Sequence, residues 1–381
     1  MKIILLTTFY KPSVGGVERQ VEEIFLNLKR GHNVRVFTTD ASHSTNKRLK
    51  NVPVEHGVER FKYLFGFGFF FRFSLSLVIN LLFTDFDIVH VHNSHDAHLL
   101  PALLIKIIRR KKIVITGHNP YVVDKSKRKE RLSKGVIFFD SILKIFRLGV
   151  DKYIALLESE KQFVNNYLKI PLNKIDIIPN GIRDPYYKEV RRLNSSNLFY
   201  TKYNLNKDNY KLVAGLLCRV DFVKGIQNLK TAVNNNPDCL FIIGGGDGGY
   251  LESLKEMFKK NSNIFFTGEF LNVNESLDFY AFIDIFLLPS VYEPFGITIV
   301  EAMTQGKYIL ATSKGGPKEI IKGEYGEVLD PLNEQIWSDR INDIKESIDV
   351  FTTKGQLGIK DSLEYKWERI TDKLVSLYKS I

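Results

Sequence analysis

The chain has 381 residues, of which 44% are hydrophobic and 25% are charged. These proportions are ordinary for a globular protein and exclude an intrinsically disordered or collagen-like chain. The length corresponds to about two domains. The two cysteines, Cys218 and Cys239, exclude a disulfide framework. Because each lies in an apolar run, we expect buried thiols and a reducing, cytoplasmic compartment.

The positive charge of the chain is unevenly distributed. The formal net charge is +11. Residues 1–180 carry 29 Lys and Arg against 16 Asp and Glu, a net charge of +13, whereas residues 181–381 carry 25 against 27, a net charge of −2. This asymmetry predicts an anionic partner for the first half alone, either a membrane surface or a polyanion.

Short apolar runs alternate with helical patterns through the first half. Strands are expected over residues 3–8, 33–38, 87–91, 112–116, 151–156 and 174–178. Apolar residues recur at helical spacing from Val17 to Leu28, Gly31 ends that helix, and a later helical stretch ends near Arg110. Strands that alternate with helices favour a parallel sheet covered by helices on both faces.

The second half repeats this plan, with apolar runs over residues 212–217, 239–243, 264–267, 285–288 and 308–311. We therefore predict an α/β protein of two tandem doubly wound Rossmann-like domains, 1–181 and 182–361, separated at the turn cluster Pro179-Asn180-Gly181. An apolar stripe from Leu363 to Ile381 predicts a terminal helix over 362–381. No apolar run reaches the roughly 18 residues of a membrane-spanning helix, and the apolar start of the chain is too short for a signal peptide.

Two loops follow strands where doubly wound sheets bind ligands, beyond the carboxyl ends of the strands. Gly15-Gly16 follows the first strand and precedes a helix N-terminus, where close backbone approach and the helix dipole favour an anion. Arg219 and Lys224 follow the first strand of the second domain, and a guanidinium fork beside an ammonium can clamp a diphosphate. An ordinary turn and a solvated surface pair are the alternative interpretations.

The segment from Glu293 to Glu301 carries the sharpest pattern. Gly296 lies at a turn where a helix starts, so N–H groups can face a phosphate there. Glu293 precedes this turn and Glu301 lies two turns into the helix, so they cannot both be N-caps. Carboxylates near a diphosphate are costly unless they bind neutral hydroxyls, which a sugar supplies. The alternative for Glu301 is a charge on the helix surface.

In their order and spacing, these motifs resemble a retaining glycosyltransferase of family 4 with the GT-B fold. In the first half the matching elements are Gly15-Gly16-Val17-Glu18, Gly31-His32, Phe86-Asp87-Ile88-Val89-His90, His118 and Pro179-Asn180-Gly181. In the second half they are Cys218-Arg219, Lys224-Gly225, Gly244 to Asp247, Glu293-Pro294-Phe295-Gly296, Glu301-Ala302-Met303 and Gly315-Gly316-Pro317-Lys318-Glu319. The resemblance implies two domains that face a cleft, with the acceptor on the first, the nucleotide-sugar donor on the second, and the terminal helix crossing back to the first.

The resemblance also implies roles for matching residues of the second domain. Arg219 and Lys224 would bind the donor diphosphate. Glu301 would bind the ribose of the nucleotide, and Glu293 would contact the donor sugar. The backbone N–H groups expected at the sugar or the phosphate are those of Phe295, Gly296 and Ile297.

In the first domain, the resemblance implies that Gly16 faces the diphosphate and that His118 lies over the transferred sugar. Family members retain the anomeric configuration, and the leaving phosphate can itself take the acceptor proton. We therefore expect catalytic roles for His118 and Glu293. No metal and no other cofactor is expected.

Three further patterns allow other interpretations. The glycine run 244–249 after a strand, with Glu269 20 residues beyond it, fits a nicotinamide-binding fingerprint. Asp85-Phe86-Asp87 resembles a metal-binding DxD motif, but it precedes its strand. Imidazoles in an acceptor cleft, or a zinc site, would explain a set of closely spaced histidines: His90, His92, His95 and His98.

Aromatic and basic residues gather in the first half. Eight phenylalanines lie between residues 61 and 83, and basic runs follow at residues 106–112 and 125–131. One interpretation is core packing with solvated faces. The other is an aromatic, basic surface in a membrane interface, with Lys127, Arg128 and Lys129 contacting the acceptor or the membrane.

These observations predict a cytoplasmic enzyme, peripheral on the inner face of the plasma membrane. It would move a sugar from a nucleotide-sugar donor to a membrane-linked or saccharide acceptor in cell-surface glycan or glycolipid synthesis. One alternative is a nucleic-acid-binding protein that stacks bases on the aromatics of the basic half, but the donor motif argues against a nucleic-acid partner. Another is a sugar-nucleotide epimerase or phosphorylase of the same architecture.

Overall fold

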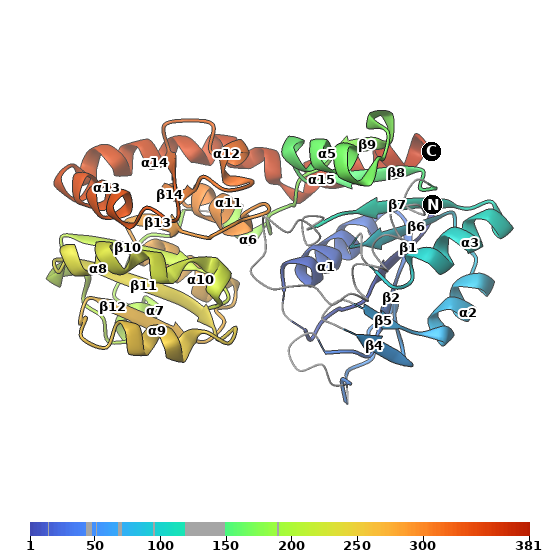
Figure 1. Cartoon of the computed structure of the whole chain (residues 1–381), viewed down its shortest axis with the longest axis horizontal. Helices are drawn as coiled ribbons and strands as arrows, with labels where there is room; N and C mark the ends of the chain where they lie inside the picture. The colour runs from blue at the N-terminus through green and yellow to red at the C-terminus, as the bar shows by residue number, and fades with distance from the viewer. Residues whose placement is uncertain are drawn as a thin grey trace. The chain divides into compact units, whose positions relative to one another are not determined.

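The computed structural model describes residues 1–13, 15–42, 48–50, 52–67, 71–93, 96–118, 149–188 and 190–381. The chain divides into two units (Figure 1). Unit 1 comprises Met1–Gly181 and Trp367–Ile381, and unit 2 comprises Ile182–Lys366. The chain therefore passes from one unit to the other at residues 181–182 and again at residues 366–367.

Unit 1 is built around a seven-stranded sheet with the order β3-β2-β1-β6-β7-β8-β9, in which all neighbouring strands are parallel. The strands are β1 (Lys2–Thr7), β2 (Asn33–Thr39), β3 (Val58–Phe61), β6 (Ile88–His92), β7 (Lys112–Thr116), β8 (Lys152–Ala155) and β9 (Ile175–Ile177). The central strands are buried on both faces, which is why they form continuous apolar runs in the sequence. A separate antiparallel hairpin joins β4 (Phe65–Phe67) to β5 (Phe71–Phe73).

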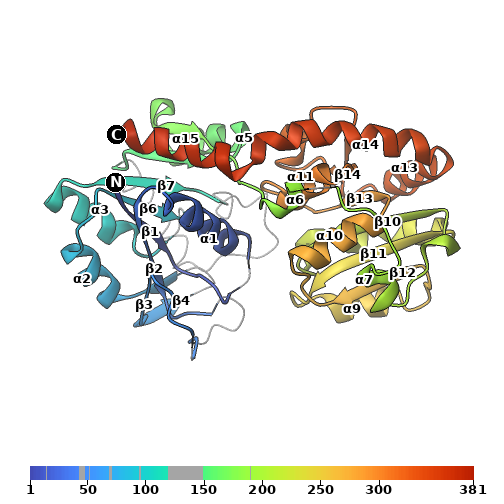
Figure 2. The same cartoon turned by 180° about the vertical axis from the view of Figure 1, so that it is seen from behind.

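Helices cover both faces of this sheet (Figures 1 and 2). On one face, α2 (Leu75–Phe83) and α3 (Leu99–Arg109) share an apolar core with the strands. On the other face, α1 (Gly16–Leu28) packs beside the terminal helix α15 (Trp367–Lys379). Helix α5 (Glu158–Phe163) continues into the π turn Val164–Leu168, whose ends are buried in the first of these cores.

The terminal helix accounts for the apolar stripe at the end of the chain. Trp367, Ile370, Leu374 and Leu377 are buried in the core of unit 1, as expected for a helix that crosses back to the first domain. The helix begins at Trp367 rather than at residue 362. The reason is that Leu363–Tyr365 forms a 3₁₀ turn that belongs to unit 2.

Unit 2 contains a six-stranded sheet with the order β12-β11-β10-β13-β14-β15, again with parallel neighbours. The strands are β10 (Leu212–Leu217), β11 (Cys239–Gly246), β12 (Ile264–Gly268), β13 (Ile285–Leu288), β14 (Tyr308–Thr312) and β15 (Gly326–Leu329). The sequence did not predict β15, because this edge strand is short, only partly buried and interrupted by Glu327. Two parallel, helix-covered sheets confirm the predicted pair of Rossmann-like domains.

The helices of unit 2 are α6 (Pro185–Lys188), α7 (Leu198–Thr201), α8 (Lys230–Asn235), α9 (Leu251–Met257), α10 (Val273–Phe282), α11 (Ile297–Thr304), α12 (Pro317–Ile320), α13 (Glu334–Glu346) and α14 (Ile348–Ser362). Within the polar segment 184–210, α7 anchors Phe199, which is buried against Phe279 and Phe282. In the described part of the chain, no helix has the length and apolar character needed to cross a membrane.

Candidate functional site

Lys224 and Glu293 form an ion pair at the carboxyl edge of the unit 2 sheet. Lys224 ends the 3₁₀ turn Phe222–Lys224 that follows β10, and Glu293 lies between β13 and α11. Lys224 Nζ donates to Glu293 Oε2 at 2.8 Å, and Ser290 Oγ donates to the same oxygen at 3.3 Å. Burial alone would lower the pKa of Lys224, but Glu293, with smaller contributions from Cys218 and Asp221, outweighs burial, so the pKa lies above its usual value. The lysine is therefore charged.

Two glycines let the loops that carry this pair approach each other. Gly225 has φ +69°, and a Cβ atom there would overlap the carbonyl oxygen of Pro289, which follows β13. Gly315 has φ +106° and forms a backbone bridge with Glu293, whose carbonyl oxygen a Cβ atom would overlap. A side chain at either position would push the loops apart, so both glycines position the ion pair.

Arg219 is close to Lys224 in the sequence but has a different partner. Its Nε and Nη2 atoms donate to Asp221 Oδ2 at 3.1 and 3.0 Å. The other carboxylate oxygen, Asp221 Oδ1, accepts the Val223 N–H at 3.1 Å and so caps the turn that carries Lys224. With 44% of its side chain exposed, Arg219 is accessible to a ligand.

The glycine run 244–249, which begins within β11, packs against the loop that carries Arg219. The Cys218 N–H donates to Gly244 O and the Val220 N–H donates to Gly246 O, both at 2.9 Å. These bonds continue the pairing with β11 beyond the end of β10. This close backbone approach explains the glycines in the run, which also match a nicotinamide-binding fingerprint.

Helix α11 begins at this edge without a side-chain cap. Gly296, with φ +99°, is its N-cap and Ile297 its first residue. The Phe295 side chain is buried against Tyr365, with ring centroids 6.0 Å apart, so Phe295 offers a ligand only its backbone. The uncapped N–H groups and the dipole of this helix favour an anion.

Glu301 on α11 is oriented by a tyrosine that the sequence analysis did not single out. Tyr280 on α10 donates its hydroxyl to Glu301 Oε2 at 3.0 Å. Burial raises the pKa of Tyr280 well above its usual value, so this hydroxyl stays protonated. A tyrosine inside an apolar helical pattern predicts only a core residue, so the sequence holds no signal for this contact.

In unit 1, Gly16 is the first residue of α1 and Gly15 is its N-cap. The buried Glu18 side chain folds back over this helix end. Its Oε2 atom lies where a Cβ atom at position 15 would overlap it, and Gly15 has none. The Glu18 side chain thus occupies the α1 N-terminus in the manner of a capping residue at this position. An anion that approaches Gly16 meets this side chain, and contact between Gly16 and the diphosphate stays a prediction.

His118 lies at the carboxyl edge of the unit 1 sheet in a cluster of imidazoles. It follows β7, and its Nε2 lies 3.1 Å from Nδ1 of His92, the last residue of β6. The neighbouring His90 bonds to Tyr378 OH at 2.6 Å and to Thr116 Oγ1 at 2.7 Å. Burial lowers the pKa of His118 to about 4 and that of His90 to about 3. The imidazoles are therefore neutral near pH 7 and suit hydrogen bonds with neutral hydroxyls.

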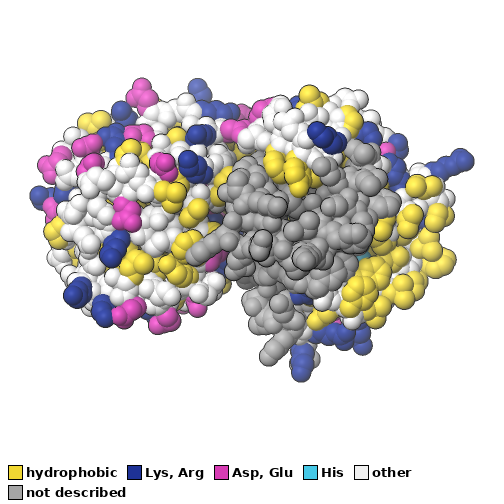
Figure 3. All heavy atoms as spheres, viewed as in Figure 1, with side chains coloured by type: hydrophobic (Ala, Val, Ile, Leu, Met, Phe, Trp, Pro, Cys, Tyr) yellow, Lys and Arg dark blue, Asp and Glu magenta, His cyan; other side chains and the backbone are white. Residues whose placement is uncertain are grey.

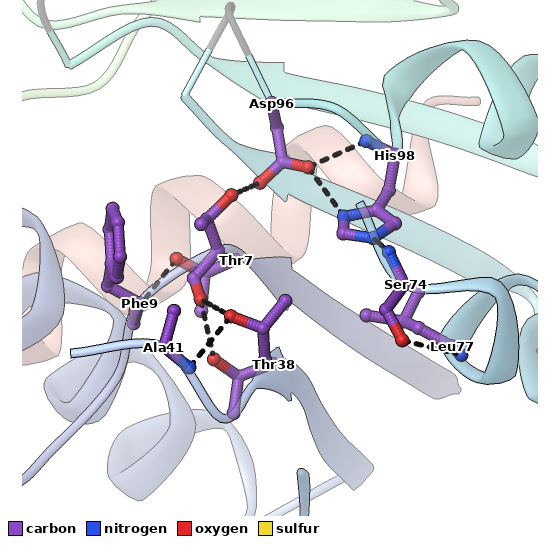
Figure 4. A network of polar contacts seen from close by, with 10 residues as sticks. Thr7, Phe9, Thr38, Ala41, Ser74, Leu77, Asp96 and His98 are labelled. Carbon is purple, nitrogen blue, oxygen red and sulfur yellow. Dashed lines mark hydrogen bonds and ion pairs between the residues drawn. The ribbon is translucent and has the colours of Figure 1, made fainter. Parts of the chain in front are cut away.

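His98 belongs to a separate polar network (Figure 4). Its Nδ1 donates to Asp96 Oδ1 at 2.9 Å, and its Nε2 accepts the Ser74 N–H at 3.0 Å. Asp96 Oδ2 accepts the hydroxyl of Thr8 at 2.7 Å, so the network ties the end of β1 to the starts of α2 and α3. Within the described ranges, no three potential ligands converge on a metal position. His95 lies outside those ranges.

Asp85 and Asp87 lie at the opposite edge of the unit 1 sheet. Asp87 accepts the backbone N–H of Lys2 at 2.8 Å, and Asp85 forms an ion pair with the Lys2 ammonium. Because β1 and β6 begin here, these carboxylates are separated from His118 by the length of the strands. The predicted contact residues Lys127, Arg128 and Lys129 fall outside the described residues.

The chain matches two family models. Residues 14–184 match the model described as Glycosyltransferase Family 4, and residues 201–349 match the model described as Glycosyl transferases group 1. The chain is 26% identical to an uncharacterized glycosyltransferase of Methanocaldococcus jannaschii, over 100% of the chain and 98% of that protein. It is 27% identical to the alpha-monoglucosyldiacylglycerol synthase of Streptococcus pneumoniae, over 82% of the chain and 71% of that protein.

Among solved structures, Anabaena HepE in complex with UDP matches with a TM-score of 0.78 at 20% identity, over 100% of both chains. HepE has also been solved with UDP-glucose. This likeness confirms the GT-B fold that the sequence predicted. With both family models, it identifies the chain as a glycosyltransferase of the GT-B type. More particularly, the family 4 model covers the amino-terminal half and the group 1 model the carboxyl-terminal half.

Proposed function

We propose that the protein is a retaining glycosyltransferase of family 4 that transfers a sugar from a nucleotide-sugar donor to a membrane-linked or saccharide acceptor. Its product would be a cell-surface glycan or a glycolipid. The observation that carries the donor assignment is the Lys224–Glu293 pair beside the uncapped start of α11. HepE, solved with UDP and UDP-glucose, supports this class of donor. The pneumococcal relative, named a synthase of monoglucosyldiacylglycerol, supports a lipid acceptor.

In this proposal, unit 2 binds the donor through its charged edge. A lysine ammonium has three N–H donors, so the bond from Lys224 to Glu293 leaves donors for the diphosphate. Arg219 adds a planar fork for phosphate oxygens. The Glu293 carboxylate accepts hydroxyls of the sugar, and Glu301, oriented by Tyr280, accepts hydroxyls of the ribose.

Transfer breaks the bond between the anomeric carbon and the phosphate oxygen, and the acceptor oxygen bonds to that carbon on the same face. The acceptor proton passes to the leaving phosphate oxygen. Lys224, Arg219 and the α11 N-terminus stabilise the charge that develops on the diphosphate, so we propose that transfer needs no divalent metal. His118 contacts the transferred sugar, and Gly16 contacts the diphosphate once the Glu18 carboxylate moves aside.

The acceptor is assigned to unit 1, whose edge of neutral imidazoles suits hydroxyl groups. The net charge of +13 over residues 1–180 favours an anionic surface. We therefore propose a cytoplasmic enzyme on the inner face of the plasma membrane, with Lys127, Arg128 and Lys129 at the acceptor or the lipid headgroups.

A panel of nucleotide sugars tests the donor assignment. One nucleotide should protect the protein against thermal unfolding, and one of its sugars should be hydrolysed slowly in the absence of acceptor. Nuclear magnetic resonance of the transferred sugar should show the anomeric configuration of the donor. Absence of protection by every nucleotide sugar would refute the donor site, and an inverted product would refute retention.

A further inference from the structure

Helix α2 carries apolar residues on two opposite faces. Leu77 and Leu81 are buried in the core of unit 1. Leu75, Ile79 and Phe83 recur at steps of four on the other face and are 48%, 47% and 78% exposed. Ser76 and Asn80 are the polar residues of this helix, and both are exposed. The exposed apolar side chains beside them need an apolar environment that the core of unit 1 does not supply.

The neighbouring helix α3 repeats this arrangement. Its buried face includes Leu103 and Ile105, whereas Leu104, Ile107 and Ile108 are 51%, 74% and 71% exposed. Helices α2 and α3 pack against each other, so the two outward stripes form one surface. Figure 3 shows hydrophobic side chains gathered over these two helices. We call this surface, formed by Leu75, Ile79, Phe83, Leu104, Ile107 and Ile108, the α2–α3 face.

The charges around the α2–α3 face are of one dominant sign. Helix α2 has no charged residue, and the charged residues of α3 are Lys106 and Arg109. Exposed Arg110 and Lys112 follow at the end of α3. The acidic neighbours are Asp85, paired with Lys2 and Lys111, Asp87, which accepts the backbone N–H of Lys2, and Asp151, paired with Lys106 and Lys112. An apolar face with a basic rim matches the layered chemistry of an anionic bilayer, which is apolar inside and negatively charged at its surface.

A second copy of this chain fits the α2–α3 face less well. Two such faces in contact would bring their basic rims together, and like charges at close range repel. Anionic lipid headgroups provide the complementary charge. The Ser74–His98 bond joins the starts of α2 and α3, and Asp96, which bonds both His98 and Thr8, links them to the edge of the sheet where we assign the acceptor (Figure 4). A lipid-linked acceptor in a bilayer along these helices therefore has its headgroup near that edge.

We propose that unit 1 docks on anionic membranes through the α2–α3 face, with α2 and α3 lying in the interface and their exposed apolar side chains among the lipid chains. This inference rests on the proposed function, because a lipid-linked acceptor requires a membrane. The surface that binds the membrane is identified from the structure. Each apolar side chain contributes by leaving water, and each basic side chain at the rim contributes by attraction to the headgroups.

The test is co-sedimentation of the full chain with phosphatidylcholine vesicles, with and without phosphatidylglycerol. The face variant Ile79→Ser, Phe83→Ser, Ile107→Ser removes exposed side chains and should fold normally. It should bind the anionic vesicles at least about tenfold more weakly, because large apolar side chains no longer leave water. A rim variant, Arg110→Asn with Lys112→Gln, should bind more weakly at low salt, and the difference should shrink as salt screens the charges.

The matched control is Leu332→Ser, Val350→Ser, Leu357→Ser, which removes side chains of unit 2 that are 69%, 53% and 56% exposed. It should bind vesicles as the unchanged chain does. Equal binding by the face variant, or no binding by the unchanged chain, would overturn the proposal. So would sedimentation velocity that shows a dimer of the unchanged chain and a monomer of the face variant, because a second copy would then cover the surface.

Hydrolysis of the nucleotide sugar without acceptor separates this proposal from the proposed function. The face variant should retain this hydrolysis, since it leaves unit 2 unchanged. If neither the unchanged chain nor the face variant hydrolyses any donor, while the face variant loses vesicle binding and the unit 2 control keeps it, the proposed donor site fails and the docking surface stands. If hydrolysis is normal and vesicle binding survives in the face variant, the docking surface fails and the donor site stands.

Discussion

The two sheets share a strand topology, but their carboxyl edges differ in electrostatic character. In unit 2 the edge carries paired charges, Lys224 with Glu293 and Arg219 with Asp221. In unit 1 the edge carries imidazoles, among them His118. Burial lowers the pKa of His118 and so opposes its protonation. Because both units are doubly wound sheets, the residues at the strand ends and in the loops that follow them, and not the strand order, set the chemistry of each edge.

The difference has a simple physical cause. A buried group keeps its charge when an opposite charge lies beside it, as Glu293 lies beside Lys224. His118 is instead bonded to His92, a second imidazole, and among the described residues no carboxylate compensates for its burial. Paired charges suit a diphosphate, and neutral donors and acceptors suit sugar or lipid hydroxyls. Substitutions at the unit 2 edge and acid pH at the unit 1 edge test this difference.

The largest expected effect is at the charged edge. Glu293→Gln and Lys224→Ala should each lower kcat about a hundredfold or more, because each removes a fixed electrostatic contact from a preorganised site. The matched control is Glu252→Gln, which breaks the exposed Lys255–Glu252 pair of the same unit and should leave kcat unchanged. Steady-state kinetics with the donor found in the panel, together with melting curves, provide the measurement. Near-normal turnover in both site variants would remove this pair from the site.

A smaller effect is expected where a neutral residue orients a charge. Tyr280→Phe removes the hydroxyl that bonds Glu301. A hydrogen bond to a charged group contributes about 1.5–3 kcal/mol, so KM for the donor should rise about tenfold, with a smaller change in kcat. Tyr308→Phe, which removes a hydroxyl bonded to Glu327 elsewhere in unit 2, is the control. Equal KM values in both variants would show that Tyr280 does not position Glu301 for the donor.

The neutral edge predicts that unit 1 is sensitive to acid. Burial lowers the pKa of His118 to about 4 and that of His90 to about 3, and it lowers the pKa of His92 well below 6.5. Below pH 6.5 the unfolded chain binds protons that folded unit 1 excludes. Stability is therefore complete above pH 6.5 and falls as the pH falls toward 4. At pH 5.5 the loss is about 1 kcal/mol for each buried histidine.

The two tryptophans separate the units in this measurement. Trp367 lies in unit 1 and Trp337 in unit 2, and the chain has no others. In Trp337→Phe, the fluorescence of Trp367 reports the denaturant unfolding of unit 1 alone. Its midpoint should fall between pH 7 and pH 5.5, and His92→Gln should reduce that fall. A midpoint for Trp367 that does not change with pH would contradict the neutral state of these imidazoles.

The smallest expected effect is that of metal removal. If Lys224, Arg219 and the α11 N-terminus stabilise the leaving diphosphate, a chelator should leave turnover unchanged. The measurement is turnover with EDTA, and again after addition of magnesium or manganese. Activity abolished by the chelator and restored by either ion would show that the charged edge does not suffice.

Several parts of the fold were predictable from local patterns. The expected runs 112–116, 212–217 and 285–288 coincide with β7, β10 and β13, because strands buried on both faces are continuously apolar. The edge strands β3 and β15 were missed because their exposed sides admit charged residues such as Glu59 and Glu327. The edge strands β9 and β12 are also partly buried, but their apolar residues are frequent enough to have predicted them.

By itself, the sequence determined where the strands end, which loops contain glycine and which side chains near those loops carry charge. Only the tertiary structure decided which of them meet. Glu293 and Lys224 are 69 residues apart, and they pair because β10 and β13 are neighbours in the sheet and Gly225 admits the second loop. The Glu18 carboxylate lies over the α1 N-terminus for a similar reason, because Gly15 has no Cβ atom that would exclude it. Local patterns reflect the burial of single elements, whereas contacts between loops depend on strand order and backbone approach, which no single segment encodes.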